Sequence, residues 1–170
     1  MTAGFTTERL VAKPLAWADE GDLAVLHADE CVMATMGGGA ATPDESRAWI
    51  ERNIHHSEEP GLGIFVFRDR KSGEFVGRGA LRRIEIGGSE EVEVGYALVP
   101  RRWGQGLATE MAAGLVCYAE RAGLADLVAY TEPTNAASRR VMEKVGFAYE
   151  RDVPHHGRAQ VLYRRRRADP

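Results

Sequence analysis

The chain has little of what marks several large classes of protein. Its 170 residues contain only 2 cysteines, Cys31 and Cys117, which lie far apart and match neither a disulfide framework nor a zinc-binding spacing. We expect both to be buried thiols of a protein in a reducing compartment. No apolar run approaches the length of a membrane span, and residues 1–6 have neither the basic start nor the apolar run of a signal peptide. These absences predict a cytoplasmic protein that no membrane holds.

Neither sign of charge dominates. The formal net charge is −3, from 22 basic and 25 acidic residues, which disfavours nucleic acid or an anionic membrane surface as a general partner. One basic run, residues 164–167, is interpreted as the solvated end of the last strand and a loose tail. With 44% hydrophobic and 28% charged residues, the chain has the composition of one ordinary globular domain.

The most informative segment is residues 98–109, LVPRRWGQGLAT. It has the pattern of an apolar strand, a glycine-rich turn and the start of an amphipathic helix. Gly104 and Gly106 let the backbone approach a ligand closely, and the first turn of a helix presents unpaired N–H groups to an anion. A pyrophosphate fits such a site. The segment lacks the Lys-Ser/Thr pair of a P-loop and the three glycines of a dinucleotide fingerprint.

This segment resembles the acyl-CoA loop of the GCN5-related N-acetyltransferase (GNAT) superfamily, Gln/Arg-x-x-Gly-x-Gly/Ala. Two registers match, one over residues 101–106 and one over residues 103–108. We favour the second because its spacing from Pro100 is typical of the family. Residues 100–110 are also similar to the Pro-x-x-Trp-Gly-x-Gly-x-Ala-Thr-Glu string of the RimJ/RimL-like subgroup, the ribosomal-protein N-acetyltransferase type. A plain strand–turn–helix connection is the alternative, which a match of this length disfavours.

The resemblance extends along the chain. Residues 8–15 look like the first strand of the family, and residues 17–23 look like the entry to its first helix. Residues 134–147, TNAASRRVMEKVGF, resemble its Asn-x-x-Ser-x-x-x-x-Glu-Lys-x-Gly-Phe signature. We therefore expect a flexible N-terminus at residues 1–7, a single GNAT domain at 8–165 and a tail at 166–170.

Apolar periodicity predicts an α/β order. Helices are expected after residue 17, from a capping box at Thr42 to Glu45, near 105–122 and at 136–144. The resemblance implies a three-layer α/β fold (α+β) with a mixed sheet of about six to seven strands, about four flanking helices and a splay between strands ending near Val99 and Thr131. Strands are expected near residues 10–15, 63–68, 75–86, 91–99, 127–131, 147–153 and 160–165.

The resemblance further implies that acetyl-CoA binds in the splay without a metal. The backbone at Leu98 and Val99 is expected to bond the pantetheine arm, and the Leu98 N–H to polarise the thioester carbonyl. The pyrophosphate is expected on residues 104–109, with positive potential from the helix start and from Arg101 or Arg102. The expected cofactor contacts are Leu98, Val99, Trp103, Gly104, Gln105, Gly106, Leu107, Ala108, Thr109, Asn135 and Ser138.

Direct attack of an amine on a thioester requires a base for the ammonium and benefits from a proton donor for the thiolate. Glu93 is the first candidate for the base, since it interrupts an apolar pattern; an exposed charge on the face it shares with Glu91 is the alternative. Met142 stands where many relatives carry a tyrosine donor, so Ser138 is predicted to substitute. For Ser138, helix capping or a pantetheine contact is the alternative. Asn135 is expected to contact the arm, with a turn role as its alternative.

The acceptor remains open between a small-molecule amine and a peptide N-terminus, selected by residues 16–57 and 153–159. Tyr130 and Tyr163 could line its pocket or be packed aromatics. The histidine pairs at 55–56 and 155–156 are not expected to chelate a metal, because neighbours on a strand point to opposite faces; His155 or His156 is a reserve base. A homodimer is left open, and a non-catalytic CoA-binding module acting as a sensor or interaction platform is the alternative function.

Overall fold

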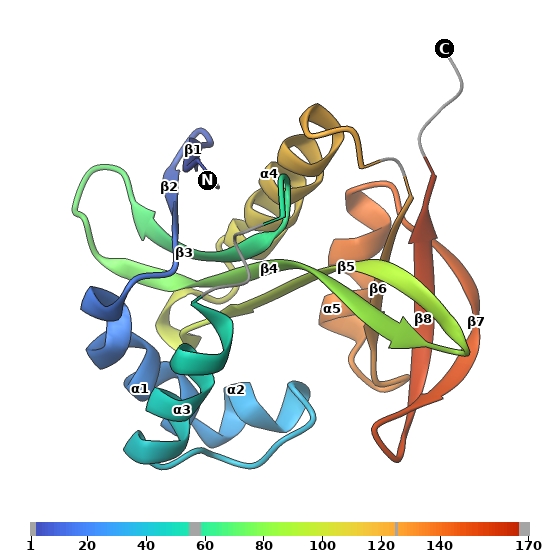
Figure 1. Ribbon diagram of the computed structural model, residues 1–170, viewed down its shortest axis with the longest axis horizontal. Helices are drawn as coiled ribbons and strands as arrows, with labels where there is room; N and C mark the ends of the chain where they lie inside the picture. Colours follow the sequence, from blue (N-terminus) through green and yellow to red (C-terminus); the bar gives the residue numbers. More distant parts are fainter. Residues whose placement is uncertain (1–2, 55–58, 125, 167–170) are drawn as a thin grey trace.

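The computed structural model describes residues 3–54, 59–124 and 126–166, and one mixed sheet of eight strands forms its centre (Figure 1). The order across the sheet is β1-β2-β3-β4-β5-β6-β8-β7. We expected about six to seven strands. The strand that we did not predict is β1, which has only two residues, too few to show an alternating pattern, and pairs with β2. The strands are β1 (Phe5–Thr6), β2 (Leu10–Pro14), β3 (Gly63–Asp69), β4 (Phe75–Ile86), β5 (Ser89–Leu98), β6 (Leu127–Thr131), β7 (Ala148–His155) and β8 (Arg158–Arg165).

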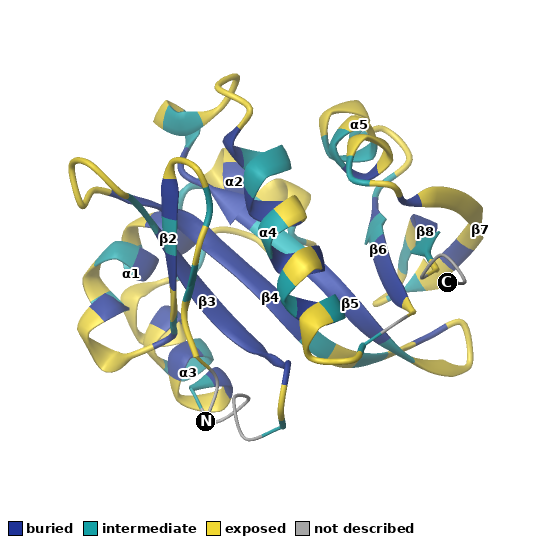
Figure 2. Ribbon diagram, turned by 90° about the horizontal axis from the view of Figure 1, so that it is seen from above, coloured by how far each residue is buried: buried dark blue, intermediate teal, exposed yellow. Residues whose placement is uncertain are grey.

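Helices cover both faces of the sheet (Figures 1 and 2). Alternate residues of β3 face different cores: Ile64 lies in the cluster with Leu23 and Ile50 of α1 and α3, whereas Phe65 lies in the cluster with Leu115 of α4. The sheet is therefore the middle of three layers. The described helices are η1 (Trp17–Asp19), α1 (Glu20–Ala28), α2 (Glu30–Thr35), α3 (Pro43–Asn53), η3 (Pro100–Arg102), α4 (Leu107–Arg121) and α5 (Ala136–Lys144).

Local sequence signals explain where these helices begin. The predicted capping box of α3 is present, because Thr42 Oγ1 accepts from the Glu45 N–H and the Glu45 carboxylate accepts from the Thr42 N–H. Where one helix was expected after residue 17, the structure has the short 3-10 helix η1 followed by two α-helices, α1 and α2. The backbone of Asp29 is extended (φ −78°, ψ 113°), and its side chain caps α2 by accepting from the Val32 N–H.

The sheet is weakly joined between β5 and β6. These strands run parallel and pair in register at Glu93 and Val128. Beyond that point β5 continues to Leu98 and β6 to Thr131, and no further register pair joins them in the described residues. The two strands thus separate toward their carboxyl ends, where the splay was predicted.

Two side-chain predictions were wrong. Cys31 and Cys117 are exposed, because both lie on outward positions of their helices, α2 and α4. Within the basic run, Arg164 is mostly covered and donates to the carboxylates of Glu91 and Glu150. These ion pairs therefore link β8 to β5 and β7.

Among the described residues, no helix has the length and apolar character needed to cross a membrane.

A buried polar network lies between the sheet and helices α1 and α3. Arg78 Nε donates to His27 Nε2 at 3.1 Å, so the hydrogen of the neutral imidazole is on Nδ1, 2.8 Å from Ser46 Oγ. The guanidinium of Arg78 also stacks over the ring of Trp49, 4.4 Å from its centroid. Burial, with the neighbouring charge of Arg78, lowers the pKa of His27 from 6.5 to about 4.

This network predicts that the fold loses stability in mild acid. The unfolded chain takes up a proton on His27 near pH 6.5, but the folded chain does so only near pH 4, so stability declines as pH falls between these values. The total effect is on the order of 3 kcal/mol. The free energy of unfolding, measured with urea, should fall more between pH 7 and pH 4.5 for wild type than for His27→Gln. Equal losses would contradict the prediction.

Candidate active site

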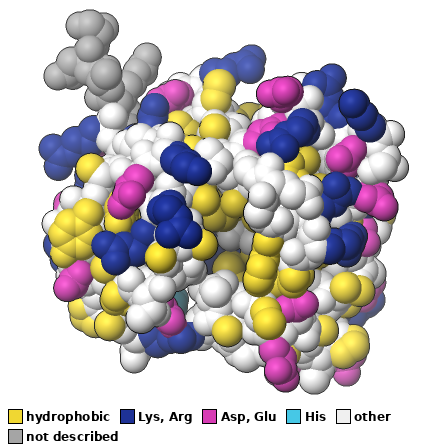
Figure 3. Space-filling model, turned by 180° about the vertical axis from the view of Figure 1, so that it is seen from behind, with side chains coloured by type: hydrophobic (Ala, Val, Ile, Leu, Met, Phe, Trp, Pro, Cys, Tyr) yellow, Lys and Arg dark blue, Asp and Glu magenta, His cyan; other side chains and the backbone are white. Residues whose placement is uncertain are grey.

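A cavity of about 590 Å³ occupies the gap between β5 and β6. It extends from the turn before α4, along α5, to α2 and the β7–β8 hairpin. The space-filling view shows a hollow near the centre of the molecule, with basic side chains near its rim (Figure 3). The cavity thus connects the glycine-rich segment with Glu93, two features that lie on different elements.

The glycine-rich segment forms an open cradle. Gly104 and Gly106 have φ values of 73° and 75°, which side-chain-bearing residues rarely adopt. A Cβ at Gly104 would meet nothing within 4 Å, and one at Gly106 would meet only the Arg9 guanidinium, at 3.6 Å. Helix α4 begins immediately afterwards at Leu107. Its first N–H groups have no side-chain cap, so the cradle offers the donors that a pyrophosphate accepts.

The N-terminal segment anchors this cradle, a connection that we did not predict from the sequence. The Glu110 carboxylate, in the first turn of α4, accepts from Thr7 Oγ1 at 2.5 Å and from Arg9 Nε at 2.7 Å. Arg9 Nη1 also donates to the Gln105 carbonyl at 2.9 Å. The only sequence signal was the presence of Glu110 in the family string.

Positive charge near the cradle comes from more residues than the sequence predicts. Arg102 lines the cavity and is paired with Glu74, and Arg101 donates to the Phe75 carbonyl at 3.3 Å. Arg140 and Lys144 of α5 line the cavity, and neither has an acidic partner among the described residues. These two cations lie four positions apart and so share a face of the helix.

Leu98 and Val99 differ in what their backbones offer. The Val99 N–H donates to Val76 at 3.0 Å, and its carbonyl accepts from the Arg102 N–H at 2.9 Å, so Val99 has no free backbone donor. Val99 can therefore bond a ligand only through the second lone pair of its carbonyl oxygen, and the predicted contact stays a prediction. By the alternation of an antiparallel ladder, the Leu98 N–H points away from β4, toward the gap. The Leu98 carbonyl accepts from Trp103 Nε1 at 2.9 Å, while the Trp103 side chain remains half-exposed.

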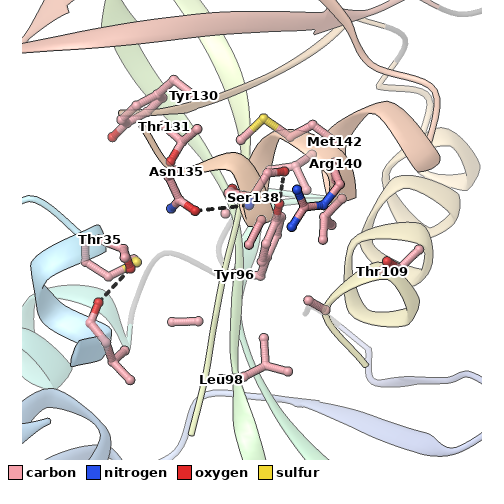
Figure 4. A pocket seen from close by; sticks show the side chains of 18 of the residues that line it. Thr35, Tyr96, Leu98, Thr109, Tyr130, Thr131, Asn135, Ser138, Arg140 and Met142 are labelled. Atoms are coloured by element: carbon pink, nitrogen blue, oxygen red, sulfur yellow. Dashed lines mark hydrogen bonds between the residues drawn. The ribbon is translucent and has the colours of Figure 1, made fainter. Parts of the chain in front are cut away.

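Ser138 meets a tyrosine hydroxyl that we did not predict to be there (Figure 4). The phenol oxygen of Tyr96 lies 3.1 Å from Ser138 Oγ and 3.2 Å from the Ser138 carbonyl oxygen. Asn135 Oδ1 accepts from the Ser138 N–H at 3.1 Å and so caps α5. Met142 also lines the cavity and is almost fully buried.

Glu93 is buried on the sheet and forms an ion pair with Arg82. Its Oε2 accepts from Arg82 Nε at 2.5 Å, whereas no described residue donates to Oε1. Glu93, Arg82 and Tyr130 all line the cavity. Burial, together with the nearby charge of Glu93, raises the pKa of Tyr130 to about 12, so its hydroxyl stays protonated. The pairing partner of Glu93 was not foreseen, although Arg82 lies directly opposite it in the register of β4 and β5.

The prediction that the rings of His155 and His156 point to opposite faces was wrong. Their centroids are 4.0 Å apart and both residues line the cavity, because His156 lies in the hairpin turn with φ 49° rather than on the strand. His155 Nε2 is buried without a hydrogen-bond partner among the described residues, and burial lowers the pKa of this imidazole. The other pair, residues 55–56, lies outside the described residues.

Of the two tyrosines predicted as candidates for the acceptor pocket, only one lines the cavity. Tyr130 lines the cavity, while Tyr163 is packed in the core and its hydroxyl bonds Arg139 and Glu143. In the part of the chain that the structure describes, no cluster of three or more His, Cys, Asp or Glu side chains could hold a metal ion.

Comparison with known protein families identifies the family of this chain. The model of the acetyltransferase (GNAT) domain matches residues 9–148. The chain belongs to the GNAT family of acetyltransferases. This GNAT chain is similar to the uncharacterized protein YkkB of Bacillus subtilis, with 26% identity over 161 residues that cover 94% of each. It is also 32% identical to an Aspergillus fumigatus FsC-acetyl coenzyme A-N(2)-transacetylase over 154 residues, 84% of this chain and 64% of that protein.

Solved structures share the fold of this GNAT enzyme. A GNAT acetyltransferase from Bacillus anthracis has a TM-score of 0.82 and 22% identity, covering 96% of this chain and 98% of that one. A spermidine N-acetyltransferase from Vibrio cholerae, in complex with CoA and spermine, has a TM-score of 0.72 and 20% identity, with 92% and 93% covered. A ribosomal-protein-S5-alanine acetyltransferase from Vibrio fischeri has a TM-score of 0.77 and 16% identity, covering 98% of this chain and 97% of that one. The chain is an N-acetyltransferase by family, and these structures establish its fold.

Proposed function

We propose that this GNAT enzyme uses acetyl-CoA to acetylate a primary amine, on a small molecule or a peptide N-terminus, by direct attack. One observation carries the proposal: a single cavity joins the cradle before α4 to the carboxylate of Glu93 through the gap between β5 and β6. Acetyl-CoA supplies an acetyl group activated as a thioester. A phosphate-binding end and a proton-accepting end at opposite ends of one cavity are what that reaction requires.

The cofactor end is assigned to backbone groups. The N–H groups of Gly104, Gln105, Gly106, Leu107, Ala108 and Thr109 would hold the pyrophosphate. Arg140 and Lys144 add positive charge beside them. The Leu98 N–H would donate to the oxygen on which charge develops, since it faces the gap. Asn135 and Ser138 would border the arm, and the Trp103 ring would cover the cradle.

Glu93 is proposed as the base at the acceptor end. Arg82 holds Oε2, which fixes the carboxylate plane and leaves Oε1 facing the cavity. An ammonium entering beside α2 and the β7–β8 hairpin would meet this oxygen. His155 Nε2, at the same end, has no hydrogen-bond partner in the part of the chain that the structure describes and is the reserve acceptor for that proton.

The acceptor class is narrowed by the charges of the cavity. Glu93 is the only acidic residue among the described residues that line it, so a polycation would find a single carboxylate there. We propose a monoamine acceptor and, on the string at residues 100–110, membership of the RimJ/RimL-like subgroup.

The test is free-thiol release from acetyl-CoA by the purified protein with a panel of amino acids, peptide N-termini, polyamines and aromatic amines. We expect turnover with at least one monoamine and slower turnover with spermidine. Tight CoA binding without thiol release from any amine would instead favour the non-catalytic CoA-binding module.

A further inference from the structure

Met142 leaves this site without a phenol on α5, yet a phenol reaches the same helix from β5. Tyr96 projects from the strand toward Ser138, and its oxygen lies within 3.2 Å of both the hydroxyl and the carbonyl oxygen of that residue (Figure 4). No other hydrogen bond is present for the Tyr96 hydroxyl in the described residues. Tyr96, Ser138 and Leu98 all line the cavity, so the two hydroxyls adjoin the gap that the Leu98 N–H faces.

We propose that Tyr96 is a positioning residue for proton delivery to the departing sulfur, acting through the hydroxyl of Ser138. The inference rests on the proposed acetyl-transfer function. In this proposal the single hydrogen of the Tyr96 hydroxyl goes to Ser138 Oγ rather than to the Ser138 carbonyl oxygen, and so directs the Ser138 hydrogen into the cavity. A lone serine hydroxyl rotates among several partners, whereas one that accepts from a fixed phenol has fewer orientations.

The chemistry of the step is balanced. A C–N bond forms, the thioester C–S bond breaks, and the amine nitrogen gives up two protons. Glu93 accepts one of these protons and releases it to solvent. Ser138 gives its hydrogen to the sulfur as Tyr96 donates to Ser138 Oγ, and the second amine proton restores the phenol through water. Burial raises the pKa of Tyr96 to about 12, so the phenol remains protonated at neutral pH, which this role requires.

The first test is the single-turnover rate of acetyl transfer. Tyr96→Phe and Ser138→Ala should each slow it about fivefold, since one hydrogen bond contributes about 1 kcal/mol, and the double variant should be no slower than either single one. Tyr118→Phe is the matched control. The Tyr118 ring packs in the same core, and its hydroxyl has no hydrogen bond among the described residues.

The second test needs no turnover. At pH 9.5, where part of the free thiol is ionised, calorimetry should show that CoA binds wild type about fivefold tighter than CoA lacking its sulfur. Tyr96→Phe should lose that preference, and Tyr118→Phe should keep it. An unchanged sulfur preference and rate in Tyr96→Phe, or additive losses in the double variant, would overturn the inference. Wild type that binds CoA but acetylates nothing would count against the proposed function instead.

Discussion

Gly106→Val is expected to abolish measurable CoA binding while leaving a folded protein. Gly106 has a φ of 75° and ends the cradle immediately before α4. A β-branched residue adopts this conformation only with strain, so the turn would shift and carry the first N–H groups of α4 away from the pyrophosphate. Losing two charge-assisted hydrogen bonds corresponds to about 3 kcal/mol or more, which weakens affinity at least about a hundredfold.

Gly73→Val provides the matched control for calorimetry. Gly73 also has a φ of 75° and open space for a Cβ, but it lies in the turn between β3 and β4, away from the cavity. Both variants should lose similar stability in thermal unfolding. Only Gly106→Val should lose affinity for CoA. Wild-type affinity in Gly106→Val would refute the cradle as the pyrophosphate site.

Glu93→Gln is expected to lower turnover about a hundredfold or more at neutral pH with little change in acetyl-CoA affinity. The amide accepts no proton from an ammonium but keeps the shape of the carboxylate. Because the free amine becomes more abundant as pH rises, the loss should shrink toward pH 10. Steady-state rates across this pH range give the decisive trend.

Glu91→Gln is the control for that measurement. Glu91 lies two residues earlier on β5 and is held by Arg164, and it does not line the cavity. Its replacement should leave the pH profile of turnover unchanged. If Glu93→Gln turned over at the wild-type rate throughout, Glu93 would serve only as the partner of Arg82, and His155→Gln would be the next variant to assay.

Much of the site could be anticipated because its signals are local in the sequence. The cradle follows from two glycines that precede an amphipathic helix, and the start of α3 follows from Thr42, Pro43 and Glu45. In both cases the residues that interact are within a few positions of one another.

Contacts between distant segments could not be anticipated in this way. The pairing of Glu93 with Arg82 depends on the register of β4 and β5, and the meeting of Tyr96 with Ser138 depends on how far α5 leans over the sheet. The convergence of His155 and His156 depends on one positive φ in a hairpin, which a non-glycine residue seldom adopts. A single sequence contains no local signal for these distances.

The anchoring of the cradle by Thr7 and Arg9 makes the amino-terminal segment part of the proposed cofactor site in practical terms. Removing the residues before Leu10 would take away the ring of Phe5, which packs against the core. Glu110 would lose both side chains that hold it, and Gln105 would lose the donor to its carbonyl. We therefore expect expression designs that trim this segment, or fuse a rigid domain directly to Thr7, to weaken acetyl-CoA binding. A flexible linker placed ahead of Phe5 keeps the segment free to dock beside α4.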